Sequence, residues 1–285
     1  MAGTFSTSPA RSEVEAALAR VERLQFDRTY RDRHSLFYVE GVRNFVQVID
    51  RKFEISAILF SEKLLIAPLA RKMVRSARRC GIPTISITPE QYRRVCRTDR
   101  ASGVGAIVRQ QWSKLDDISP QAGLCWIVVE NVRSPGNLGT LIRTSEAVGG
   151  AGFIFVGGRG DPFDADAVRA SMGALFAQKL VRTDFRALGC WMRRHGCRAI
   201  GASPDGSADF HSFDYPRSTV LFLGEERQGL TQQQRDFCQD LVRIPMLGAA
   251  DSLNLGVAGS LLMYEVYRSH KLCGSPDILK TYARD

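Results

Sequence analysis

IPMLGAADSLNLGVAGSLLMYEVYR, residues 244–268, decides how the C-terminal part of this chain folds. Apolar residues on both sides of Pro245 predict that a strand ends there, because proline cannot donate to a central sheet ladder. A Gly/Ala loop follows, and we expect Ser252 to be the N-cap of a helix, with Asn254 in the first turn. Apolar residues at helical spacing then predict an amphipathic helix, with a stripe made of Leu253, Val257, Leu261 and Tyr264.

Two glycines lie inside this predicted helix. Gly256 and Gly259 each cost about 1 kcal/mol of helix stability relative to alanine. Glycine is retained where another backbone or a ligand must approach closely. The segment alone therefore leaves two interpretations open, a close-packed contact between two helices and a contact with a ligand.

The composition is that of an ordinary globular protein, with 44% hydrophobic and 24% charged residues. No apolar run approaches the roughly 20 residues that span a bilayer, and the first residues lack the apolar core of a secretory signal. Seven cysteines are scattered without a C-x-x-C pair. We expect reduced, mostly buried thiols, a cytoplasmic protein, no membrane contact and no metal site.

Positive charge is concentrated in the first part of the chain. Residues 1–122 carry 21 basic and 13 acidic side chains, which is +8 of the total formal charge of +9. Because guanidinium groups pair bidentately with phosphate, two arginine clusters predict contact with nucleic acid. A solvated basic surface is the alternative. The predicted RNA-binding residues are Arg71, Arg75, Arg78, Arg79, Arg93, Arg94 and Arg97.

Strand-like and helix-like segments alternate in both parts of the chain, which predicts an α/β protein with largely parallel sheets. We expect a helical extension over residues 1–32 and a smaller basic α/β domain that binds RNA over 33–110. A linker over 111–122 and a second α/β domain over 123–285 complete the predicted organisation.

In the second domain, two further loops follow buried strands, and ligands bind at the carboxyl ends of strands in open α/β sheets. In the first loop we expect Asn137 to be an N-cap. Arg143 could bind a phosphate or form a surface ion pair with Glu146. The second loop holds Glu225 and Glu226. Adjacent residues of an extended strand point to opposite faces, so one inward carboxylate is favoured over the acid/base pair of a hydrolase.

In this order, the three loops resemble the three motifs of the SpoU-type RNA 2′-O-ribose methyltransferases of the SPOUT superfamily. Residues 36–109 resemble, less strongly, the accessory substrate-binding domain of that family, which is similar to an RNA-binding ribosomal protein. The first motif, N-x-G-x-x-x-R, is matched by Asn137, Gly139 and Arg143. The second, G-x-E-x-x-G-L, is matched by Gly224, Glu226, Gly229 and Leu230. The third, I-P-M followed by S-L-N, is matched by Ile244, Pro245, Met246, Ser252, Leu253 and Asn254.

The resemblance implies that residues 123–285 form a trefoil-knotted catalytic domain with a mostly parallel sheet. It implies that S-adenosyl-L-methionine is the cofactor and that a ribose 2′-hydroxyl of RNA is methylated without a metal. The cofactor-binding residues it implies are Gly224, Ile244, Met246 and Leu253. The catalytic residues it implies are Asn137, Arg143, Glu226, Ser252 and Asn254.

The arginine that matches Arg143 is proposed in this family to remove the proton of the 2′-hydroxyl. Guanidinium groups keep their proton in proteins, so a phosphate-bound Arg143 that orients the 2′-hydroxyl while water takes the proton is physically easier. The sequence leaves both roles open. Family members are typically homodimers with the site near the subunit interface, and we expect a homodimer here.

The extra basic domain favours ribosomal RNA of the 23S type over tRNA as the substrate. The alternatives are a tRNA 2′-O-methyltransferase and a non-catalytic RNA-binding or ribosome-assembly protein that keeps the fold.

Overall fold

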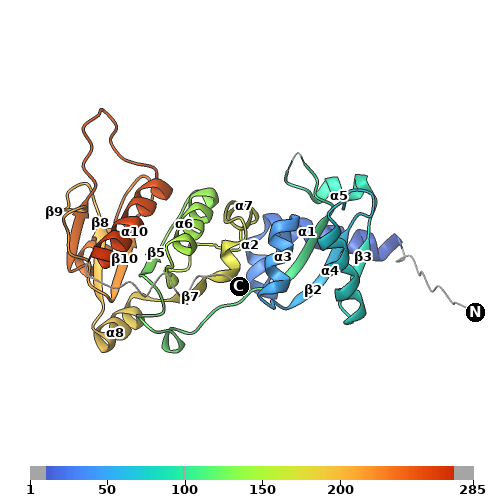
Figure 1. Cartoon of the computed structure of the whole chain (residues 1–285), viewed down its shortest axis with the longest axis horizontal. Helices are drawn as coiled ribbons and strands as arrows, with labels where there is room; N and C mark the ends of the chain where they lie inside the picture. Colours follow the sequence, from blue (N-terminus) through green and yellow to red (C-terminus); the bar gives the residue numbers. More distant parts are fainter. Residues whose placement is uncertain (1–10, 99, 273–285) are drawn as a thin grey trace, which may run out of the picture. The chain divides into compact units, whose positions relative to one another are not determined.

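The computed structural model describes residues 11–98 and 100–272 (Figure 1), which fall into two compact units. Unit 1 comprises residues up to Gln110 together with Phe163–Phe176. Unit 2 comprises Gln111–Pro162 and the residues from Ala177 onward. The compact units therefore differ from the expected division, because a segment from the middle of 123–285 packs with the first unit. The division into an RNA-binding and a catalytic part stays a prediction.

Unit 1 contains a mixed sheet in the order β1-β4-β2-β3. Strand β4 is antiparallel to both of its neighbours, and β2 and β3 are parallel. The largely parallel sheet expected for this part is therefore wrong. The loop after α5 brings the chain back to the carboxyl end of β1, where the Gly41 N–H donates to the Val104 carbonyl. Strand β4 therefore starts where β1 ends and runs antiparallel to it. The elements are α1 (Arg11–Phe26), α2 (Arg28–His34), β1 (Leu36–Glu40), α3 (Val42–Asp50), β2 (Ile55–Phe60), α4 (Pro68–Arg79), β3 (Thr84–Ser86), α5 (Pro89–Val95), β4 (Val104–Arg109) and α7 (Ala165–Ala170).

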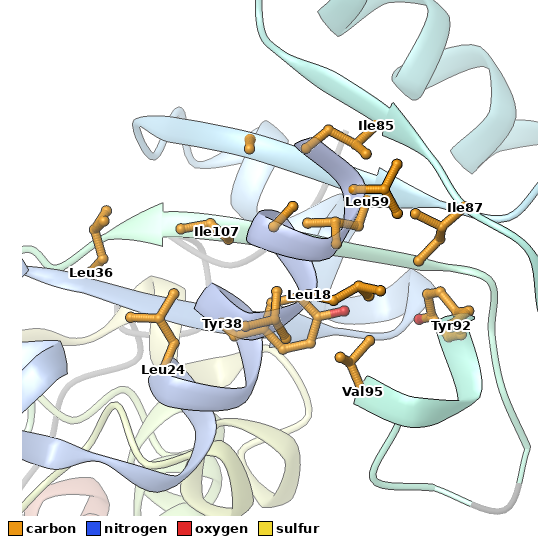
Figure 2. Packing of buried hydrophobic residues seen from close by; sticks show 14 residues of the cluster. Leu18, Leu24, Leu36, Tyr38, Leu59, Ile85, Ile87, Tyr92, Val95 and Ile107 are labelled. Carbon is orange, nitrogen blue, oxygen red and sulfur yellow. The ribbon is translucent and has the colours of Figure 1, made fainter. Parts of the chain in front are cut away.

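Both faces of this sheet are covered by helices. On one face, α1 and α5 bury a cluster that includes Leu18, Leu24, Tyr38 and Ile107 (Figure 2). Helix α1 is thus part of the core, whereas the sequence placed it in an extension. On the other face, the Phe37 ring packs against the Phe163 and Phe176 rings from the second segment of the unit, with centroids 4.6 and 6.3 Å away.

Unit 2 is built on a parallel sheet in the order β7-β6-β5-β10-β8-β11-β9, which confirms the parallel arrangement predicted for this part. Its central strands β5 and β10 are fully buried, as their continuous apolar sequences indicate. The trefoil knot stays a prediction. The elements are η1 (Leu115–Asp117), β5 (Trp126–Val129), α6 (Pro135–Ala147), β6 (Gly152–Val156), β7 (Lys179–Thr183), α8 (Phe185–His195), β8 (Arg198–Ala202), β9 (Ala208–Asp209), β10 (Thr219–Leu223), α9 (Gln232–Phe237), β11 (Asp240–Arg243) and α10 (Leu255–Leu272). The short helix η2 (Ala174–Ala177) belongs to unit 1 except for its last residue.

Helix α10 differs from the prediction at its start. It begins at Leu255, and the Asn254 Oδ1 accepts the Val257 N–H at 3.3 Å, so Asn254 takes the N-cap position expected for Ser252. Serine and asparagine cap about equally well, and spacing alone did not separate them. Its predicted apolar stripe also faces outward, because Val257, Leu261 and Tyr264 remain 41–53% exposed.

The two glycines of α10 lie against α6. A Cβ on Gly259 would come within 2.4 Å of the Leu141 side chain, and the nearest atoms to a Cβ on Gly256, apart from Asn254, belong to Thr140. The hydroxyls of Thr144 and Ser260 lie 2.8 Å apart across the same contact. The helix-packing interpretation of these glycines is therefore confirmed.

The cysteines are less buried than expected. Only Cys125 among the described residues is buried, and burial raises the pKa of its thiol to about 12. Cys80 and Cys190 are exposed, while Cys96, Cys197 and Cys238 are half-buried and Cys273 lies outside the described residues. Over the part of the chain that the structure describes, no helix is both long and apolar enough to span a membrane.

Candidate active site

The carboxyl ends of β8, β10 and β11 surround a cleft of about 360 Å³ in unit 2. The strand order changes direction beside it, because β5 continues to β6 and β7 on one side of β10 while β8, β11 and β9 lie on the other. Ligands of open α/β sheets bind at such a point. The fold therefore places a ligand-sized cleft between the loops that carry the second and third sequence motifs.

All four predicted cofactor residues line this cleft, namely Gly224, Ile244, Met246 and Leu253. Leu223, Val242, Leu255 and Ala258 add to the lining, so much of the wall is apolar. An apolar wall with backbone groups from loops suits a flat heteroaromatic ring such as adenine. The residues present thus fit the cofactor that the resemblance implies.

The loop after β10 is a tight turn that aims its two carboxylates. Glu225 and Gly229 exchange backbone hydrogen bonds of 3.0 and 2.9 Å, and Gly229 has φ +64°. A Cβ on Gly224 would lie 2.1 Å from the Gly229 carbonyl carbon. Both glycines of the motif serve the turn itself, because a side chain at position 224 would clash with the Gly229 backbone and one at position 229 would be strained in the left-handed conformation.

Glu226 joins the second motif to the first. Its carboxylate accepts the backbone N–H groups of Arg133 and Ser134 and the side-chain amide of Asn137, each at 3.0 Å. Partial burial acts to raise the pKa of this carboxyl, but the hydrogen bonds from Ser134, Arg133 and Asn137 outweigh it and lower the pKa below its ordinary value. The carboxylate is ionised next to the positive end of α6, where a negative charge is stabilising.

Asn137 extends this connection to the third motif. Its Oδ1 accepts the side-chain amide of Asn254 at 3.0 Å, so a continuous hydrogen-bond chain runs from Glu226 through Asn137 to Asn254. The sequence predicted Asn137 as the N-cap of α6, and this is wrong. The helix begins at Pro135, and Ser134 takes the cap position. The Asn137 side chain is thereby free to bridge the loops.

Arg143 and Ser252 lie outside this chain of hydrogen bonds. Ser252 is exposed and lines the cleft. Arg143 is exposed on α6, and its guanidinium makes no hydrogen bond or ion pair with the residues that the structure describes, Glu146 included. The surface ion pair considered for Arg143 is therefore absent, and its guanidinium is available to an external anion.

Glu225 does not form a catalytic pair with Glu226. Its carboxylate lies 2.7 Å from the Arg133 Nε and accepts the side-chain amide of Asn131 at 2.6 Å. Both carboxylates of the loop are thus held by structural partners, which argues against a hydrolase.

Sequence reasoning missed one wall of the cleft. Ser203, Pro204 and Asp205 follow β8 and also line the cleft. The Asp205 carboxylate lies 3.5 Å from the Arg235 guanidinium, which also lines the cleft. The strand before this loop was predicted, so the rule that ligands bind at strand carboxyl ends would have identified it as a fourth loop.

The predicted RNA-binding arginines of α4 fall into two kinds. Arg71 donates to the Leu65 and Glu62 carbonyls of the preceding turn, and the Arg78 Nε donates to the Thr84 hydroxyl at the start of β3 at 2.7 Å, so both have partners within the unit. Arg75 and Arg79 are exposed and form neither hydrogen bonds nor ion pairs within the described residues. Arg75 and Arg79 are therefore the two α4 arginines whose guanidinium groups are available to an external phosphate.

The second arginine cluster is paired with carboxylates of its own unit. Arg94 lies 3.2 Å from Glu15 and 3.4 Å from Glu22, and Arg97 lies 2.9 Å from Asp166. Arg93 has a longer contact, of 3.9 Å, with Glu90. RNA contact stays a prediction for all seven arginines, but these ion pairs leave α4 as the more accessible cationic surface. Among the described residues, no cluster of three or more His, Cys, Asp or Glu could hold a metal.

Comparisons with known proteins agree with this geometry. Residues 125–264 match the model of the SpoU rRNA methylase family, and residues 19–106 match that of the MRM3-like substrate binding domain. The chain is 28% identical to the 23S rRNA (uridine(2479)-2′-O)-methyltransferase of Streptomyces viridochromogenes, over 92% of this chain and 93% of the relative.

Solved structures are similar over most of the chain. The AdoMet-bound rRNA methyltransferase of Sinorhizobium meliloti is 30% identical with a TM-score of 0.80, covering 88% of this chain and 94% of that one. The SpoU methyltransferase AviRb of Streptomyces viridochromogenes in complex with AdoMet is 28% identical, also with a TM-score of 0.80, and the match covers 91% and 100%.

Replacement of Glu226 by glutamine tests whether its ionised carboxylate stabilises the start of α6. We expect Glu226→Gln to lower the free energy of unfolding by about 1 kcal/mol at neutral pH, because charge-assisted hydrogen bonds are lost from a partly exposed group. The folded pKa is below the unfolded one, so this contribution is complete at neutral pH and disappears as the pH falls below the ordinary carboxyl range.

Urea unfolding of both proteins between about pH 7 and about pH 3 measures this difference. A difference that keeps the same size throughout that range would contradict the assignment.

Proposed function

This chain belongs to the SpoU rRNA methylase family, and we propose that it transfers a methyl group from S-adenosyl-L-methionine to a ribose 2′-hydroxyl of ribosomal RNA. The observation that carries the proposal is a cleft lined by the second and third motifs, to which hydrogen bonds join the first motif. Cofactor-binding positions from the second and third motifs line it, and Glu226, Asn137 and Asn254 connect all three motifs by hydrogen bonds. The AdoMet-bound structures of two relatives support the choice of cofactor.

S-adenosyl-L-methionine supplies a methyl group on a sulfonium sulfur that leaves as a neutral thioether. Gly224, Ile244, Met246 and Leu253 would hold the cofactor against the apolar wall of the cleft. Fixing the methyl group and the ribose oxygen in line converts an encounter between two molecules into a positioned reaction, which can contribute several kcal/mol of the barrier reduction. Rigid loops are therefore the main contribution of the chain to the rate.

We assign to Arg143 the binding of a phosphate next to the target ribose. Its guanidinium is exposed and has no partner among the described residues, so its donors are available to a phosphate. Such a group can fix the phosphate and orient the 2′-hydroxyl, while water takes the proton. Ser252 at the cleft and Asn254 at the start of α10 would contact the ribose, with Asn137 and Glu226 as positioning residues.

Ribosomal RNA of the 23S type is the substrate that we favour over tRNA. The relative from Streptomyces viridochromogenes acts on 23S rRNA by name, and its match extends over both parts of the chain. A protein that only binds RNA would have no need of Asn137, Arg143, Glu226, Ser252 and Asn254 together. We place the enzyme in the cytoplasm, where bacterial relatives meet ribosomal RNA.

A homodimer is proposed from the outer face of α10. Val257, Leu261 and Tyr264 form an apolar stripe that stays 41–53% exposed. Contiguous exposed apolar surface marks interaction sites. A second copy packed against this helix would cover the stripe close to the third motif.

Replacement of Arg143 by alanine should lower the rate of methyl transfer to a 23S rRNA transcript at least about 100-fold, because an electrostatic contact to the reacting region is lost. Cofactor affinity, measured by calorimetry, should be unchanged, since Arg143 does not line the cleft. Tritium transfer from labelled cofactor measures the rate. Transfer by the variant at the wild-type rate would refute the role.

The open arginines of α4 should set the salt dependence of RNA binding. The double replacement Arg75→Ala and Arg79→Ala should reduce the slope of log affinity against log salt by about two, about one for each phosphate contact. Arg186→Ala with Arg193→Ala removes equal charge from exposed positions of α8 and serves as the control. Equal slopes for wild type and the α4 variant would make Arg75 and Arg79 a solvated surface.

The replacement Leu261→Glu should turn a dimer into a monomer, because it places a charge in the middle of the apolar stripe. Sedimentation equilibrium gives the mass of both proteins. Ile66→Glu, at another exposed apolar position outside the stripe, should leave the mass unchanged. A wild-type protein that is monomeric, or a variant that stays dimeric, would exclude this interface.

A further inference from the structure

Helix α4 presents three faces, because successive residues are about 100° apart around a helix. Ala70, Val74 and Ala77 are buried in unit 1. The arginines form a second face. The third face carries Leu69 and Met73, and Leu69 is 53% exposed although it is apolar. This third face therefore lacks a cover within the described residues.

The uncovered face is one wall of an apolar groove. Helices α3 and α4 lie side by side (Figure 1), and a groove of about 410 Å³ opens between them. Phe53, just after α3, contributes an aromatic wall, and its ring is fixed by an edge contact to Phe176 with centroids 5.1 Å apart. The large apolar side chains that line the groove are Ile49, Phe53, Ile55, Leu69, Met73 and Ile82.

Unpaired cations run along the edge of this groove. Lys72 lines the groove, and Arg75 and Arg79 follow it at helical spacing on the arginine face of α4, next to the uncovered face. None of the three makes a hydrogen bond or an ion pair with the described residues. Lys72 and Arg79 are seven positions apart, which is about 10 Å along the helix. An occupant of the groove therefore meets apolar walls and positive charge at the same time.

We propose that this groove binds unstacked bases of the substrate RNA, while Lys72, Arg75 and Arg79 bind the adjoining phosphates. A nucleotide combines a flat apolar face with a neighbouring negative charge, which is the combination that the groove complements. The large apolar side chains make up most of the lining, and Lys72, Ser76 and Cys80 contribute its polar groups, so stacking in the groove does not distinguish one base from another. The inference deepens the proposed function and rests on it, because it assumes an RNA substrate.

Base binding in the groove has a consequence for RNA shape. Bases inside a duplex are stacked and paired, so the groove is open only to loops, bulges and single strands. Unit 1 would then select the unpaired part of a structured RNA, and the phosphate contacts would add affinity without selectivity.

Two polar replacements in the groove test this inference. Leu69→Gln with Met73→Gln changes the apolar wall but leaves the charge unaltered. Affinity for a 23S rRNA transcript should fall about tenfold, as expected for weaker stacking, with the salt slope unchanged. Affinity for a fully paired RNA duplex should not change. Ile66→Gln, at a 79% exposed position outside the groove lining, is the matched control and should bind both RNAs as wild type does.

Wild-type affinity of the groove variant for the transcript would overturn the proposal, and so would an equal loss of affinity for the duplex. Weaker binding to ribosomal subunits but not to the transcript would identify a protein occupant instead. Thermal unfolding and cofactor calorimetry on each variant show that the fold is intact.

The proposed function fails separately, if wild type transfers no methyl group to any ribosomal RNA.

Discussion

The carboxylate of Glu226 is the contact on which the site depends. It accepts two backbone N–H groups at the start of α6 and the side chain of Asn137, which in turn accepts from Asn254. The second and third motifs lie in loops after strands, and the first lies in α6. One ionised group, stabilised by the positive end of a helix, thus fixes loops that lie about 90 residues apart in the sequence.

The packing beneath these loops serves the same purpose. Gly259 lets α10 approach Leu141 of α6 and Leu223 of β10, so the helix that follows the third motif rests on the elements beside the other two. The tight turn between Gly224 and Gly229 aims Glu226 at α6. The rate of a displacement reaction depends strongly on the alignment of its reacting groups, and small misplacements lower it. Rigid packing around the site therefore favours the reaction.

Much of this organisation could be predicted from the sequence, because apolar periodicity and glycine spacing are local signals. The strands and the parallel sheet of unit 2 were predicted in this way, whereas the four cofactor residues that line the cleft were implied by the resemblance to the SpoU motifs. The reversed direction of β4, the packing of Phe163–Phe176 in unit 1 and the outward face of Val257 depend on which elements become neighbours, which no local pattern contains. The ion pairs of Arg94 and Arg97 were missed for the same reason, since their carboxylate partners lie far away in sequence.

The central claim is that a ribose 2′-hydroxyl receives the methyl group. Incubation of the protein with tritium-labelled S-adenosyl-L-methionine and an unmodified 23S rRNA transcript, followed by complete alkaline hydrolysis, tests it directly. A 2′-O-methyl group blocks cleavage of the next phosphodiester, so the account predicts that the label appears in an alkali-stable dinucleotide. Label recovered in mononucleotides would place the methyl group on a base and contradict the account, as would the absence of any transfer.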